Sequence, residues 1–206
     1  QRIWIDSNLV PYAIINNSKL VAKGGAPASF DDLLQPKWKG RISLEREEYL
    51  VTQAHMQYLG KQKAIDYFKK LAQQDLVLIN GHSNQAMLLT AGEFPIIVYS
   101  DIARTEELKR KGAPIEWVKA EPHITVLVSA AITREAKHPA AARLFLNYLA
   151  SDDGQRQILA MDKPPAIPRF QPEYLRGVNL FPADWTLSDS YEEHNKIYRE
   201  IFWKSQ

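Results

Sequence analysis

The chain has 206 residues, of which 45% are hydrophobic and 24% are charged; these proportions are close to the averages of folded domains and exclude disordered and collagen-like proteins. Its 26 lysines and arginines nearly balance 24 acidic residues, whereas binding many phosphates needs a concentrated basic surface, so we expect no nucleic acid partner. The sequence has no cysteine, which excludes disulfides, thiolate catalysis and cysteine-based zinc sites.

Strand-like and helix-like segments alternate along the chain. Short apolar runs predict strands at residues 12–15, 41–44, 76–79, 95–99, 115–118 and 124–132. Helical periodicity and capping signals predict helices at residues 30–34, 49–59, 62–73, 83–91, 101–111, 138–149, 152–161 and 191–203. The alternation predicts an α/β protein with mostly parallel strands. The longest apolar run, 124–132, has the length of a strand, and a membrane span would need about 18 such residues.

Three other features complete the pass along the chain. The helix that opens at 138–139 has apolar residues at i, i+3, i+4, i+7 and i+8, which predicts one buried face. Residues 163–176 contain four prolines and predict a loop on the surface. Ser190 is the expected N-cap of the last helix.

The segment Gly81-His82-Ser83 lies between a predicted strand and a predicted helix, like the turn that exposes a nucleophilic serine. The hydrolase pattern G-x-S-x-G requires a second glycine, where this chain has Gln85. Three interpretations remain: Ser83 caps the helix, it acts as a hydrolase nucleophile, or its hydroxyl and the helix N-terminus hold a polar or anionic group of a ligand. We favour the interpretation that Ser83 caps the helix. A capping serine is also compatible with ligand binding at the same helix N-terminus.

Metal and cofactor motifs are missing from the sequence. The five histidines form no H-x-x-x-H pair, and neither a dinucleotide fingerprint nor a phosphate-binding loop is present. We therefore expect no metal site, no cofactor and no catalytic activity.

A charged segment, Glu45 to Glu48, follows the predicted strand 41–44. Such a cluster is often a solvated helix start, but loops that leave the carboxyl ends of strands also line the ligand crevice of α/β sheets. In that case Arg46 is placed to clamp an acid, and Tyr49 offers a hydroxyl and a ring. The turn at Tyr99-Ser100-Asp101 belongs to the same predicted rim, with Arg104 one helical turn further on.

Several stretches, taken in order, resemble one family. They are residues 12–17, 20–21, 27–34, 36–42, 89–93, 111–114, 138–145 and 151–155. Together they resemble the periplasmic solute-binding proteins of ABC transporters, in the group that includes the ferric-iron-binding proteins. The similarity spans nearly the whole chain.

The resemblance implies two α/β lobes that are joined by a strand hinge and enclose a ligand without transforming it. It implies a periplasmic or extracellular protein that serves transporter permease subunits and meets the membrane only through them or a lipid anchor. Residues 1–9 would be a hinge segment, 10–121 lobe two, and 122–206 the returning half of lobe one. The opening half of lobe one would precede residue 1, so one lobe is expected to be incomplete.

The resemblance also places the ligand-binding rim of lobe two. Ile102-Ala103 stand where ferric-binding members have a tyrosine pair, and neither side chain offers the phenolate oxygen that holds iron. We therefore expect a small anion or polar organic solute, held by Ser83, Ser100 and the helix N-termini. The candidate ligand-binding residues are Glu45, Arg46, Tyr49, His82, Ser83, Tyr99, Ser100 and Arg104. A serine hydrolase that uses Ser83 and a ligand-sensing domain on the same scaffold remain as alternatives.

Overall fold

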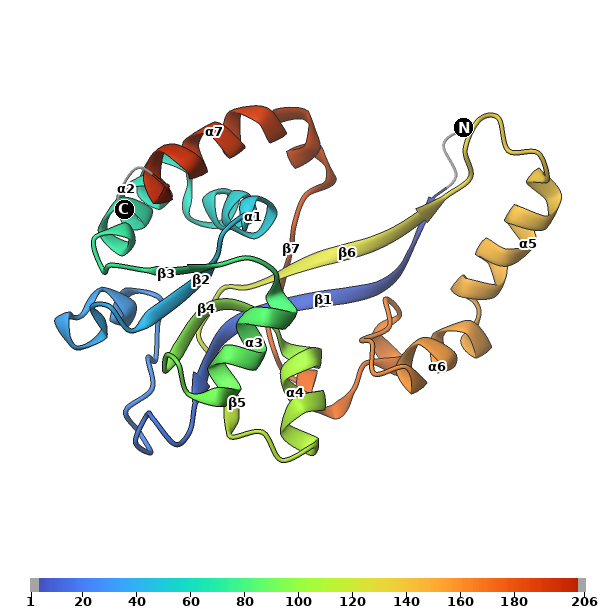
Figure 1. Cartoon of the computed structure of the whole chain (residues 1–206). Helices are drawn as coiled ribbons and strands as arrows, with labels where there is room; N and C mark the ends of the chain where they lie inside the picture. The colour runs from blue at the N-terminus through green and yellow to red at the C-terminus, as the bar shows by residue number, and fades with distance from the viewer. Residues whose placement is uncertain (1–3, 204–206) are drawn as a thin grey trace.

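The computed structural model describes residues 4–203, so residues 1–3 of the expected hinge segment 1–9 lie outside the described part. Figure 1 shows a larger α/β body and a smaller helical body, which are linked by two long strands. The strands are β1 (Trp4–Asn17), β2 (Ile42–Glu45), β3 (Val77–Ile79), β4 (Ile96–Asp101), β5 (Ile115–Trp117), β6 (His123–Ala131) and β7 (Leu180–Pro182). The predicted strands are therefore found, with ends that differ by a few residues except in β1, which begins much earlier than predicted. Strand β7 was not predicted.

Helices occupy most of the remaining chain. The α-helices are α1 (Tyr49–Leu59), α2 (Lys61–Ala72), α3 (His82–Ala91), α4 (Ile102–Arg110), α5 (Pro139–Ala150), α6 (Asp152–Ala160) and α7 (Tyr191–Phe202). Short 3-10 helices are η1 (Asp31–Leu34), η2 (Pro36–Trp38), η3 (Pro168–Phe170), η4 (Glu173–Leu175) and η5 (Trp185–Ser190). Within residues 4–203, no helix combines the length and the apolar composition that crossing a membrane requires.

The sheet is mixed, which corrects the prediction of mostly parallel strands. Its order is β3-β2-β4-β1-β6-β7, and β5 also pairs with β1. Strand β2 is parallel to β3 and β4, and β6 is parallel to β7. Strand β1 is antiparallel to all three of its partners, β4, β5 and β6. The sequence pattern identifies strands but does not reveal that one long strand runs against the others.

Strand β1 is much longer than the predicted strand 12–15. Pro11 argues against a central strand because proline donates no ladder hydrogen bond. In the structure Pro11 lies opposite Thr125 in the ladder with β6, and buried and less buried residues alternate from Ser7 to Ala13. Residues 4–11 of β1 pair with β6, and residues 12–17 pair with β4 and β5. Residues 4–9 of the predicted hinge segment are therefore part of a continuous strand that serves both bodies.

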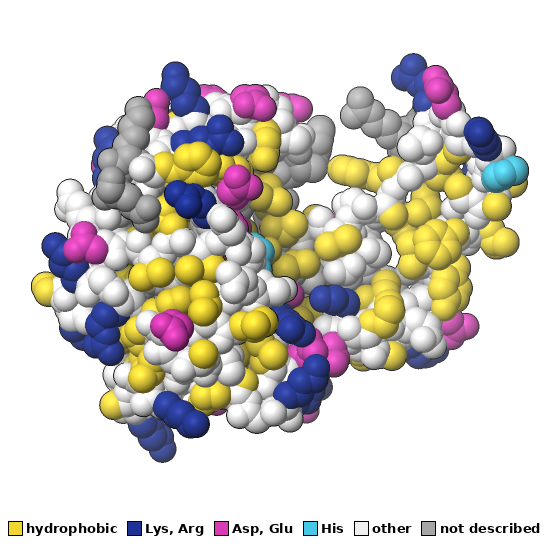
Figure 2. Space-filling view, in the orientation of Figure 1, with side chains coloured by type: hydrophobic (Ala, Val, Ile, Leu, Met, Phe, Trp, Pro, Cys, Tyr) yellow, Lys and Arg dark blue, Asp and Glu magenta, His cyan; other side chains and the backbone are white. Residues whose placement is uncertain are grey.

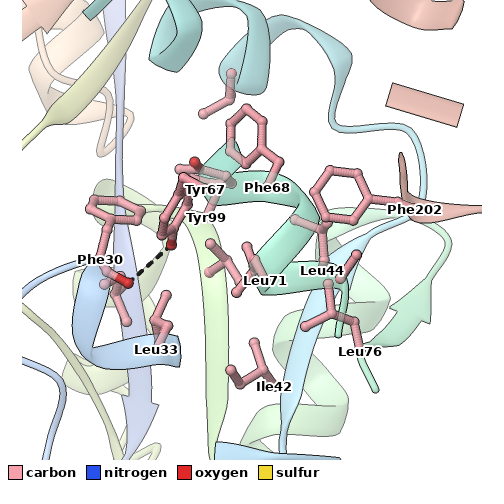
Figure 3. Close-up of a cluster of buried hydrophobic side chains, with 14 of the residues drawn as sticks. Phe30, Leu33, Ile42, Leu44, Tyr67, Phe68, Leu71, Leu76, Tyr99 and Phe202 are labelled. Atoms are coloured by element: carbon pink, nitrogen blue, oxygen red, sulfur yellow. Dashed lines mark hydrogen bonds between the residues drawn. The ribbon is translucent and has the colours of Figure 1, made fainter. Parts of the chain in front are cut away.

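Two hydrophobic clusters hold the larger body together. In the first, α1, α2 and α7 pack with the 3-10 helix η1 on one face of the sheet. Figure 3 shows Phe68, Leu71 and Phe202 in this cluster. The second lies beneath α3 and α4 on the other side, around Ile97 and Leu89. Buried apolar side chains from segments far apart in sequence thus fix the positions of the turns at the end of the sheet.

Helix α7 packs on α1 and α2 of the larger body, where Tyr198, Ile201 and Phe202 join the first cluster. The expected division had placed all of residues 122–206 in the returning half of lobe one. We propose instead that α7 belongs with lobe two. The capping signal at Ser190 predicted the helix but did not indicate which part of the molecule it would pack against.

The smaller body contains α5 and α6, which contact the outer half of β1. The predicted buried face of α5 is not covered within the described chain: Leu144 is 71% exposed and Phe145 is 59% exposed, whereas Leu146 is buried. Figure 2 shows the apolar side chains gathered on this body. The helix is amphipathic as predicted, but its apolar face is exposed in the described chain.

Candidate ligand-binding rim

Three turns meet where parallel strands of the larger body end. Strand β2 ends at Glu45, β3 leads through Gly81 into α3, and β4 ends at Asp101 before α4. The Gly81 N–H donates a hydrogen bond to Glu45 Oε1 at 3.0 Å, which ties the first turn to the second. The carboxyl ends of neighbouring parallel strands form the usual ligand crevice of α/β sheets. The predicted rim thus exists as a geometric unit.

Glu45 is buried and held from several sides. Its Oε2 accepts a hydrogen bond from the Glu47 N–H at 2.5 Å, and its carbonyl oxygen accepts one from the Tyr198 hydroxyl at 2.6 Å. Helix α7 therefore fixes the loop after β2, although Tyr198 is far away in the sequence. No signal in the sequence pointed to this support.

His82 faces a buried carboxyl group that the sequence-based set of site residues left out. Its Nε2 lies 3.4 Å from Glu48 Oε2, and the Glu48 side chain is only 5% exposed. Burial, followed by the negative charge of Glu45, raises the pKa of Glu48 well above its usual value. Burial lowers the pKa of His82, and Glu45 and Asp101 oppose this shift. The acidic segment 45–48 was noticed in the sequence, but nothing in it singled out Glu48.

Tyr12 is a further neighbour that the sequence did not suggest. It lies opposite Asp101 in the β1–β4 ladder, and its ring centroid is 5.8 Å from that of His82. Burial, together with the charges of Glu48, Asp101 and Glu45, raises the pKa of the Tyr12 hydroxyl. Glu48, Asp101 and Glu45 therefore all lie near the Tyr12 hydroxyl.

The third turn is organised by Asp101, which caps α4 by accepting a hydrogen bond from the Ala103 N–H at 2.8 Å. Burial raises the pKa of Asp101, while that hydrogen bond and the charge of Lys163 lower it. Ser100 is buried beside it. Arg104 forms an ion pair with Glu107 at 2.6 Å along the same helix, so its guanidinium group already has a partner.

Arg46 and Tyr49 turn toward α7 and not toward His82. The Arg46 guanidinium lies 5.5 Å from the centre of the Trp203 ring. The Tyr49 hydroxyl accepts a hydrogen bond from Arg199 Nε at 3.1 Å, and its ring packs on Tyr198. Both side chains help to attach the last helix to the larger body.

Tyr99 lies in the core and does not line the rim. It is 1% exposed, and its hydroxyl is hydrogen-bonded to His55 Nδ1. Figure 3 shows its ring among the apolar side chains of the first cluster. Its inclusion among the ligand-binding candidates is therefore not supported by its position.

The predicted N-cap at Ser83 is wrong. Helix α3 begins at His82, and its N-cap is Gly81, whose φ of 83° favours glycine. Ser83 is exposed, and across residues 4–203 its hydroxyl has no hydrogen bond to a histidine or a carboxylate. The predicted cap Ser190 is the N-cap residue of α7 but accepts no capping hydrogen bond.

A groove of about 790 Å³ opens between the two bodies, above β6 and β7. One wall is formed by Leu50 and Gln53 of α1 and by Tyr191, and the other by Asp6 and Ser129 on the outer parts of β1 and β6. Figure 2 shows the notch between the bodies. Among the described residues, no group of three or more His, Asp or Glu side chains is placed to hold a metal ion.

Comparisons with known proteins agree with this architecture. Residues 6–160 match the family model of bacterial extracellular solute-binding proteins. No curated protein sequence matches significantly. The periplasmic binding protein P5PA superposes with a TM-score of 0.74 at 24% identity, over 98% of this chain and 69% of that chain.

Two further solved structures show the same fold. Iron-bound HitA from Pseudomonas aeruginosa has a TM-score of 0.78 at 18% identity, over 96% of this chain and 69% of that one. AfuA from Actinobacillus pleuropneumoniae, with fructose-6-phosphate bound, has a TM-score of 0.78 at 20% identity, over 97% and 68%. These matches confirm the predicted periplasmic-binding-protein-like α/β fold, with one lobe incomplete in this chain.

Proposed function

We propose, because this chain belongs to the family of bacterial extracellular solute-binding proteins, that it binds a small polar solute between its two lobes and delivers it to the permease subunits of an ABC importer. In this proposal the protein works in the periplasm or at the cell surface and leaves the solute chemically unchanged. The lobe-two part of the site is the rim formed by the turns after β2, β3 and β4.

The convergence of those three turns carries the proposal. Glu45, His82 and Asp101 come from three separate strand ends, and the Gly81 N–H bond to Glu45 holds two of the turns together. The groove between the bodies opens beside β6 and β7, and its lining includes none of these three side chains. Strands β1 and β6 connect the bodies, as a hinge requires.

The buried residues Ile102 and Ala103 support a solute other than iron. Both lie at the start of α4, next to Asp101, and offer no oxygen ligand from their side chains. HitA is iron-bound, but a phenolate pair cannot form at this position of the present chain. A polar organic solute fits the rim better.

A thermal unfolding assay with a bacterial small-molecule extract tests the proposal. Ligand binding to the folded state stabilises it by about 2.7 kcal/mol when the free ligand is at 100 times Kd. We expect a raised Tm and recovery of the bound solute unchanged by mass spectrometry. Consumption of the solute that is abolished by Ser83→Ala would favour the hydrolase instead, and no stabilisation by the extract would contradict solute binding.

A further inference from the structure

The three helix N-termini at the rim already carry carboxylates of the protein. Glu48 is the N-cap residue of α1, Glu45 accepts the N–H of Gly81 at the start of α3, and Asp101 caps α4. Helix N-termini attract anions because their unpaired N–H groups and aligned dipoles are positive. Here Glu45 and Asp101 accept N–H groups at two of these helix ends, whereas the Glu48 side chain makes no capping hydrogen bond at the third. An anionic solute would therefore meet a carboxyl group of the protein at each of the three helix ends.

Three carboxyl groups, which we call the acidic rim (Glu45, Glu48 and Asp101), lack lysine and arginine partners within the described chain, and only Glu48 has a histidine beside it. Within the described range 4–203, no lysine or arginine forms an ion pair with any of them. Arg104 is paired with Glu107, and Arg46 lies over Trp203. The charge of Lys163 acts on Asp101 but forms no ion pair with it. The negative charge of the acidic rim is therefore left largely uncompensated.

Glu48 provides an independent sign of a missing positive partner. Its side chain is 5% exposed, and its Oε2, which faces His82, accepts no hydrogen bond within the described chain. Buried carboxylates are ordinarily paired or hydrogen-bonded, because burial without a partner is unfavourable. The rings of Tyr12 and His82 lie beside it with their centroids 5.8 Å apart. Aromatic faces next to carboxylates are the surroundings that bind organic cations.

We propose that the acidic rim, together with Tyr12 and His82, binds the positively charged end of the solute, such as a protonated amine or an N-heterocyclic cation. This inference rests on the proposed function and narrows it, because it selects a cationic solute over the small anion that the sequence had also allowed. Asp101 is half-buried at the edge of the site, whereas Glu45 and Glu48 are buried. A cation bound beside Glu48 would favour its ionised form, because burial without such a partner raises the pKa of this carboxyl group.

Ion-exchange fractions of a bacterial small-molecule extract provide the test. The purified protein is heated with the cationic, the neutral and the anionic fraction in separate thermal unfolding assays, at equal ionic strength. We expect the cationic fraction alone to raise the Tm. Stabilisation only by the neutral or the anionic fraction would overturn the cationic inference and leave solute binding standing. No stabilisation by any fraction would contradict both.

Two variants that each remove one negative charge, and one control, test whether the cation binds at the acidic rim. Asp101→Asn keeps a good helix cap, and Glu45→Gln keeps an oxygen acceptor for the Gly81 N–H. Each is expected to weaken binding of the most stabilising pure cation about tenfold, because each removes one charged partner. The control Glu135→Gln makes the same charge change in the exposed loop between β6 and α5, and its Kd should equal that of the parent. Equal affinity in all four proteins would overturn the assignment to the acidic rim.

Discussion

His55 and Tyr99 form a polar pair inside the core of the larger body. His55 Nδ1 is hydrogen-bonded to the Tyr99 hydroxyl, and the Phe30 ring packs edge-on against the imidazole at 4.8 Å between centroids. Burial lowers the pKa of His55 to about 4 from 6.5. The imidazole is therefore neutral in the folded protein over a range in which it becomes protonated in the unfolded chain.

This shift predicts a loss of stability in mild acid. Between pH 6.5 and about 4 the unfolded state binds more protons than the folded state at His55, so the free energy of unfolding falls as the pH falls. Between pH 7.5 and pH 4.5, the parent should lose about 2–3 kcal/mol more than the double variant His55→Phe/Tyr99→Phe. Urea unfolding at both pH values measures the difference.

The single variant His55→Phe serves as the control for this pair. It removes the titrating group but leaves the Tyr99 hydroxyl buried without its partner, which costs about 1–3 kcal/mol at every pH. It should therefore be less stable than the double variant, with the same weak pH dependence. Identical pH profiles for parent and double variant would contradict the role of His55.

At the scale of elements, the corner between α5 and α6 depends on one glycine. A Cβ at Gly154 would lie 2.0 Å from the Tyr148 carbonyl oxygen, a contact that real side chains do not make. Next to it, the buried Gln155 side chain donates hydrogen bonds to the carbonyl groups of Ser7 and Leu149. The first turn of α6 is therefore packed tightly against both α5 and β1.

Gly154→Ala should destabilise the protein by about 3 kcal/mol through this clash. The sign is opposite to the usual effect, since alanine is the better residue in an unconstrained helix. Asn147→Ala, at an exposed position of α5, is the matched control and should leave the free energy of unfolding unchanged or slightly raised. Chemical denaturation measures the free energy of unfolding of both variants. Equal stability of the two would show that the corner can accommodate a methyl group at position 154.

Helix α7 should stabilise the rim through a single hydroxyl group. Tyr198→Phe removes the donor to the buried Glu45 carbonyl, which we expect to cost about 1–2 kcal/mol in urea unfolding. Tyr191→Phe removes the hydroxyl of an exposed tyrosine on the same helix and should have little effect. An equal loss of unfolding free energy in both variants would mean that the hydrogen bond to the Glu45 carbonyl contributes no more than an exposed hydroxyl group does.

Much of the element pattern could be predicted, because it depends on local signals. Helix α1 has the predicted bounds, and the buried strand β4 was identified from its apolar run. The predicted strand began only after Pro11. The residues before it pair with a segment over a hundred residues away, and the local sequence pattern gives no signal of that pairing. The partner of α7 was missed for the same reason.

The candidate site was predicted in outline and not in detail. Turns that follow strands are visible in the sequence, so Glu45, His82 and Ser100 were assigned to one rim. Side-chain direction depends on tertiary partners, which is why Arg46 and Tyr49 were expected at the rim but contact α7. Which of the candidates touch a solute stays a prediction.

For the whole molecule, burial is distributed unevenly between the two bodies. Both hydrophobic clusters lie in the larger body, whereas α5 buries only Leu146 among its side chains. Regions with few buried contacts open locally at low free energy. The smaller body is therefore expected to be the less stable part.

Hydrogen exchange measured by mass spectrometry tests this difference. Amides in residues 139–150 should exchange at least tenfold faster than those in strand β4, because α5 lacks cover on its apolar face. Helix α1, which is covered by α7, is the internal control and should be protected like β4. Equal protection of α5 and α1 would contradict the expectation.

The bond from Tyr198 to the Glu45 carbonyl joins positions that are 153 residues apart. The ribosome makes β2 well before α7, so the loop that carries Glu45 gains its hydroxyl donor only after Tyr198 has been made. A nonsense codon shortly before Tyr198 would yield a product that contains every strand up to β7 but has an unsupported loop after β2. The loop after β2 therefore reaches its supported form only once α7 has been synthesised and has packed on the larger body.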